Sequence, residues 1–141
     1  MSVVPSQILY LEHGSSRLYA EAIQVIKTRH LCWSRPTLLI QGLPESSGAT
    51  RQAVIADAAQ YPEKTKLNVY DLEGCPDLIW PLAPFQIAYD LDFFSLLVQI
   101  KMNPDNSMQR QSSEQLNHFI QSFWNSHTNL FQLESPEKVS L

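Results

Sequence analysis

The stretch that most constrains the fold of this chain is residues 17–36, which read RLYAEAIQVIKTRHLCWSRP. Two runs rich in aromatic and β-branched residues flank a short polar, basic turn at residues 27–30. Such side chains favour strands, and two strand-like runs on either side of a polar turn are typical of a hairpin. A long hairpin this early in the chain predicts a small barrel or sandwich built around it.

Residues 17–26 also allow a helix, because their apolar side chains fit one helical face and a serine at 15 or 16 could cap it. The strand-like neighbours on both sides favour a strand. A helix here would change the element order to β-α-β-α-β and predict a small α/β layer, which is the alternative fold.

Further strands are predicted around this hairpin. Residues 7–13 form the first strand, and residues 31–41 form the partner strand, in which Pro36 requires an edge position, a bend or a bulge. Residues 43–66 read as an excursion outside the barrel that carries a short helix at 49–60. Strand character returns at 67–72 and 77–82.

Helices are predicted in the last third of the chain. Asp90 or Asp92 caps a helix at about 91–102, and a second helix covers about 113–127, capped by Ser112 with Gln115 or by Ser113. Residues 132–141 read as a frayed tail. We therefore expect a single α+β domain over 1–141, in which an SH3-like or half-open β-barrel at 7–89 precedes two C-terminal helices.

Composition narrows the class of protein. The 141 residues are 44% apolar and 17% charged, with a net charge of −4, which argues against a nucleic-acid-binding protein. Cys32 and Cys75 match no zinc or redox spacing, so two reduced thiols are expected. No signal peptide and no transmembrane segment are predicted, and a cytoplasmic protein is expected.

No motif points to catalysis. The four histidines lack metal-ligand spacing, the serines lack a nucleophile elbow, and the four glycines do not form a phosphate-binding loop. Turn and cap roles account for the carboxylates of the second half, namely Asp71, Glu73, Asp77, Asp90 and Asp92. We expect no enzymatic activity, no metal and no cofactor.

An aromatic and basic set gives the best candidate for binding. Trp33 and Arg35 lie two residues apart, so on a strand they share a face, and Arg29 and His30 lie at the hairpin tip. Such residues suit protein contacts or base stacking on a single strand. The alternative places Trp33 in the core and pairs Arg35 with Glu21.

A second candidate surface is residues 80–85, WPLAPF, where two prolines hold Trp80 and Phe85 in an extended run. The alternative is that both rings are buried as a rigid closure of the barrel.

The segments LYLEHGSSRLYAEAIQVI, LCWSRP, VYDL and DLIWPLAPF resemble small cyanobacterial proteins of unassigned function, over residues 7–41 and 69–99. The resemblance implies a cyanobacterial cytoplasm and a link to photosynthetic complexes, and it transfers no catalytic residue. We expect an interaction module, or an assembly or regulatory factor, that binds a protein partner and could form a homodimer through leftover apolar surface. Binding of single-stranded nucleic acid is the alternative function.

Overall fold

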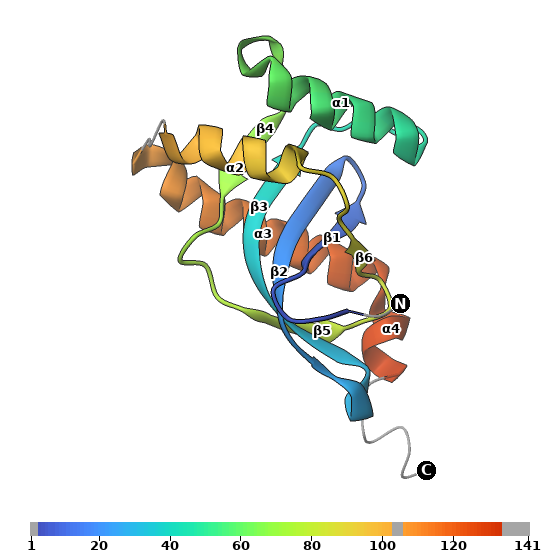
Figure 1. Cartoon of the computed structure of the whole chain (residues 1–141). Helices are drawn as coiled ribbons and strands as arrows, with labels where there is room; N and C mark the ends of the chain where they lie inside the picture. The colour runs from blue at the N-terminus through green and yellow to red at the C-terminus, as the bar shows by residue number, and fades with distance from the viewer. Residues whose placement is uncertain (1–2, 103–105, 134–141) are drawn as a thin grey trace.

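A computed structural model describes residues 3–102 and 106–133 (Figure 1). Strands β1 (Ile8–His13), β2 (Ser16–Ile26) and β3 (Leu31–Gln41) form an antiparallel meander. The hairpin prediction for 17–36 is confirmed, and the helical alternative for 17–26 is wrong because β2 pairs with a strand on each side. The short 3-10 helix η1 (Lys27–Arg29) makes the turn, and His30 completes it in the left-handed conformation with φ of 53°.

Of the edge position, bend or bulge expected at Pro36, the structure shows a bulge. The β2–β3 register shifts between Tyr19 and Ala20, so that Thr37 is the extra residue of β3. On its other edge β3 pairs first with β5 (Leu78–Pro81) and then with β4 (Asn68–Asp71), through residues 31–34 and 38–41. Pro36 therefore lies between the two partner strands. Because no strand pairs with β3 at that point of this edge, the sheet loses no hydrogen bond through the N–H that proline lacks.

The sheet is open, so the predicted barrel is wrong. Its strand order is β4-β3-β2-β1-β6, with β5 beside β4 on the same edge of β3 and with β6 (Gln86–Ile87) at the opposite edge. Three successive residues of β3, Leu38, Leu39 and Ile40, are fully buried. Because successive side chains point to opposite faces, both faces of this region must be covered, whereas a small barrel buries only its interior.

Helices α1 (Gly48–Gln60) and α2 (Asp92–Met102) cover one face of the sheet. Ser47 caps α1 by accepting the backbone N–H of Thr50, and Ile55 of α1 is fully buried against the sheet. The 43–66 segment is therefore part of the core and not an excursion outside it. Phe93 and Leu96 complete this apolar layer from α2.

Helix α3 (Asn106–Ser126) covers the opposite face, followed by α4 (Thr128–Leu133). Leu116, Phe119 and Phe123 of α3 pack into the core on this face, whereas Trp124 of the same helix is 45% exposed. The predicted start near 113 is wrong, because α3 already begins at Asn106 and Ser112 is buried within it. The predicted tail overlaps α4 at residues 132–133, and its remainder, 134–141, lies outside the described residues. The fold is thus α+β, with helices on both faces of one antiparallel sheet.

A polar network holds the layer of α1 and α2 to the sheet. The Arg17 guanidinium is nearly fully buried and bonds Glu12, the Tyr19 hydroxyl and Gln52 of α1. Gln52 in turn donates to Asp92 at the start of α2. Two strands and two helices therefore share one hydrogen-bonded network.

Candidate functional site

The pairing of β3 with β5 brings four side chains together at the hairpin end of the sheet. Trp33 and Arg35 share one face of β3, as their spacing predicts, and Ile79 of β5 lies opposite Trp33 in the strand register. Asp77, just before β5, accepts a hydrogen bond from Trp33 Nε1 at 2.9 Å and another from Arg35 Nε at 3.1 Å. We call Trp33, Arg35, Asp77 and Ile79 the tryptophan–arginine platform.

The platform is open to solvent. The Arg35 side chain is 55% exposed and Ile79 is 57% exposed, while Trp33 is half-buried. Helices α1 and α2 lie over the other end of the same sheet, away from the hairpin tip (Figure 1). The platform therefore presents an indole, a guanidinium and an aliphatic side chain on a sheet surface that α1 and α2 leave bare.

Asp77 fixes the charge state of the platform. Hydrogen bonds from Arg35 and then from Trp33 lower the pKa of the Asp77 carboxyl, and the same carboxylate raises the pKa of Arg35. Both groups stay charged at neutral pH, so they form a locally neutral ion pair beside the indole. The platform carries no net positive charge that would attract phosphates.

The other predicted binding residues lie elsewhere. Arg29 and His30 are exposed at the hairpin tip, whereas Trp80 and Phe85 are buried. The Trp80 ring stacks on Phe123 of α3 with centroids 5.2 Å apart, so the alternative of two buried rings is the arrangement observed. Glu21 faces Arg35 in the register, but the ion pair of Arg35 is with Asp77.

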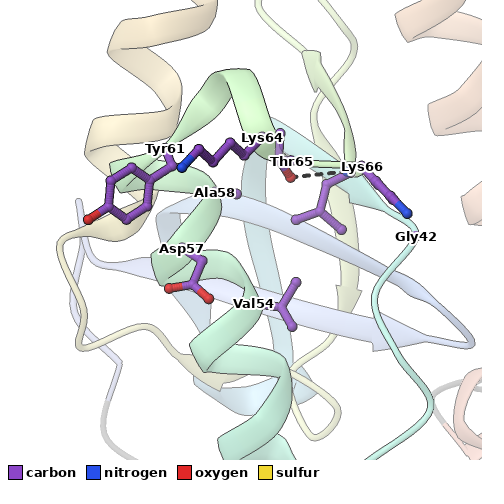
Figure 2. A pocket seen from close by; sticks show the side chains of 9 residues that line it. Gly42, Val54, Asp57, Ala58, Tyr61, Lys64, Thr65 and Lys66 are labelled. Atoms are coloured by element: carbon purple, nitrogen blue, oxygen red, sulfur yellow. Dashed lines mark hydrogen bonds between the residues drawn. The ribbon is translucent and has the colours of Figure 1, made fainter.

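A cavity of about 400 Å³ opens between the second half of α1, the turn η2 (Pro62–Lys64) and Leu67 (Figure 2). The Lys64 amino group lies 5.4 Å from the centroid of the Tyr61 ring. Figure 2 shows Lys64 and Lys66 extending in opposite directions, with Asp57 on a third side. Because its polar groups do not converge, we assign no ligand to this cavity.

A second cavity, of about 410 Å³, lies between the β1–β2 turn and α3. It brings together His13 and His118, which the sequence left as separate histidines, and the Gln41 amide donates to Gln115 in its wall at 2.8 Å. Within residues 3–102 and 106–133, no group of three or more histidine, cysteine, aspartate or glutamate side chains could hold a metal ion. Cys32 and Cys75 are free thiols.

Sequence reasoning missed one further surface. Helix α2 is apolar on its exposed side as well as on its buried side: Phe94, Val98 and Met102 are open to solvent, as is Leu91 just before the helix. The signal was present in the sequence, because the run 93–100 contains more apolar residues than one face of a helix can hold.

None of the helices in the described part of the chain has the length and apolar character that crossing a membrane requires. Comparison with known proteins identifies no matching family model, no matching curated protein and no matching solved structure.

Proposed function

We propose that this protein is a non-enzymatic interaction module, an assembly or regulatory factor that binds a protein partner through the tryptophan–arginine platform. The observation that carries the proposal is the shared carboxylate. One Asp77 side chain holds the indole of Trp33 and the guanidinium of Arg35 next to each other on an open sheet surface.

The arrangement suits protein recognition for energetic reasons. Trp and Arg are enriched among the residues that dominate protein–protein affinity. Fixing both side chains before binding lowers the entropy cost of association. Because Asp77 engages Nε and Nη2 of Arg35, other guanidinium N–H groups remain for a carbonyl or carboxylate oxygen of the partner. The partner we propose therefore presents an apolar segment flanked by such an oxygen.

A protein partner is favoured over single-stranded nucleic acid. The net charge is −4, and the cation beside the indole is already neutralised by Asp77. Phosphate binding would place further negative charge against this carboxylate. The resemblance to small cyanobacterial proteins adds photosynthetic complexes, in a cyanobacterial cytoplasm, as the proposed setting for the partner.

Affinity capture followed by calorimetry tests the proposal. The tagged chain captures partners from a cyanobacterial lysate, and the affinity of each identified partner is then measured against variants. We expect Trp33→Ala with Arg35→Ala to weaken binding by at least about 30-fold, the effect of losing one hot-spot contact of about 2 kcal/mol. The control is Trp124→Ala, which removes an exposed tryptophan from α3 instead.

Two results would count against the proposal. If the double variant keeps every partner of the wild type at unchanged affinity, the platform is not the interface. If the wild type binds single-stranded oligonucleotides with an affinity that falls steeply as salt is added, the nucleic-acid function takes its place.

A further inference from the structure

Within the part of the chain whose exposure is described, exposed apolar side chains are most concentrated on and just before α2. Among the residues whose exposure is described, nine large apolar or aromatic side chains are exposed, and five of them fall within residues 89–102. Leu91, Phe94, Val98 and Met102 form what we call the α2 stripe, preceded by Tyr89, and the five are 50% to 85% exposed. Exposed apolar surface this concentrated marks an interaction site.

The spacing of the α2 stripe places it on one side of the helix. Its members are separated by three, four and four residues, which corresponds to about one turn each. Phe93 and Leu96 point the other way, into the core beneath the helix. Helix α2 is thus packed on its inner side and offers a continuous apolar ridge on its outer side.

The charges of α2 are engaged away from the α2 stripe. Asp92 accepts a hydrogen bond from Gln52, and Lys101 binds Asp71 at 3.1 Å and Glu73 at 2.9 Å. Neither charge is left to recognise a charged partner, and the net charge of −4 opposes binding to an anionic lipid surface. The surface that binds the α2 stripe must itself be apolar and uncharged.

We propose that the α2 stripe binds the same stripe of a second copy of this chain, in a two-fold symmetric dimer. An antiparallel pair with its axis near residue 96 sets Phe94 against the partner's Val98 and brings Leu91 close to the partner's Met102. A large side chain then meets a small one at the centre, so the two ridges interdigitate. The antiparallel arrangement also aligns the helix dipoles favourably. The spacing of the α2 stripe makes it complementary to itself, which is what an isologous interface needs.

The expected affinity follows from the small size of one helix pair. Such a contact falls at the low end of interface areas, below about 1,200 Å², so the dimer should form reversibly with a dissociation constant of about 1–100 μM. Sedimentation velocity from about 5 to 500 μM should show the mass rising from the 16.1 kDa of one chain towards twice that value.

Two glutamate variants test the interface. Val98→Glu places two carboxylates near the two-fold axis and should weaken dimerisation by more than about tenfold. Ile79→Glu is the matched control, since Val98 is 56% exposed and Ile79 is 57% exposed, but Ile79 belongs to the tryptophan–arginine platform. Ile79→Glu should leave the dimer intact. The dimer proposed here and the partner binding proposed for the tryptophan–arginine platform can therefore be refuted independently of each other. If the circular dichroism spectrum shows that Val98→Glu does not fold, Met102→Glu provides a second variant of the α2 stripe.

The proposal is overturned if the wild type stays monomeric at about 500 μM, the upper end of the series. It is also overturned if both stripe variants dimerise as well as Ile79→Glu. A monomeric wild type that binds phosphatidylcholine vesicles, with Val98→Glu failing to bind them, would replace the second copy by a membrane surface.

Discussion

Replacing Glu12 by glutamine tests how the helical layer of α1 and α2 is held on the sheet. Oε2 of Glu12 accepts from Arg17 Nε at 3.1 Å, and the same oxygen lies 2.9 Å from Nη1 of Arg51. The side chains of Arg17, Arg51 and Glu12 are 2%, 10% and 23% exposed. One carboxylate therefore compensates two nearly buried guanidinium groups, and Glu12→Gln removes that compensation without changing the size of the side chain.

The magnitude follows from the geometry. Removing one partner of a buried ion pair costs about 3–5 kcal/mol, because the remaining charge is left uncompensated. Arg17 keeps its hydrogen bonds to Tyr19 and Gln52, and the partial exposure of Glu12 admits water, so we expect a loss near the lower end, about 3 kcal/mol. With a urea m-value of about 2 kcal/mol/M, the unfolding midpoint should fall by about 1.5 M.

Urea unfolding followed by far-UV circular dichroism measures this loss. The control Glu63→Gln changes an exposed carboxylate in η2 and should stay within about 0.5 kcal/mol of the wild type. Adding Arg17→Met to Glu12→Gln should recover part of the loss, because it removes one of the two uncompensated charges. Equal midpoints for Glu12→Gln and Glu63→Gln would refute the reasoning.

Three further outcomes are expected. Burial raises the pKa of Tyr19 to about 12, above the value of about 10 expected in the unfolded chain. The unfolding free energy should therefore keep its full value below pH 10 and fall by about 3 kcal/mol as the pH rises towards 12. In unfolding experiments at several pH values, Tyr19→Phe should reduce this fall. Ser34 has a buried hydroxyl without a hydrogen-bond partner in the described structure, so Ser34→Ala should raise the unfolding free energy by up to about 1 kcal/mol. Because the pKa of the Asp77 carboxyl is lowered, the carboxylate should keep its hydrogen bond to the Trp33 indole down to low pH. When the pH is decreased, the NMR signal of the indole N–H should shift with a midpoint pH below about 3.9, the value of an unperturbed aspartate. A higher midpoint would contradict this.

The hairpin and the shared face of the candidate site could be predicted because they depend on local patterns. The period of two along a strand places Trp33 and Arg35 together wherever the strand lies. The β-branched and aromatic runs around 27–30 identify the hairpin itself. Asp77 could not be assigned as their partner, since it lies 44 residues after Trp33 and meets it only through the pairing of β5 with β3.

The open sheet was missed because barrel and layered folds share the same strand signals. The distinguishing feature is the run Leu38–Leu39–Ile40, since three successive buried residues require cover on both faces. The helix predicted at 49–60 is present, but its packing against the sheet could not be predicted, because its apolar residues do not form a strong stripe. Only the structure shows that Ile55 of this helix is buried in the core.

The bare end of the sheet has a geometric cause. Strands β2 and β3 each contain 11 residues, which at about 3.3 Å per residue span about 36 Å. Helix α2 also contains 11 residues but spans only about 16 Å, and the 13 residues of α1 span about 20 Å. Neither helix can cover the full length of the strands, so the hairpin end remains exposed on that face. A surface left open only by geometry would be expected to carry lysine and glutamate, which keep exposed strands soluble. Trp33 and Ile79 stand there instead, and their presence on that uncovered end is the reason to expect a partner on it.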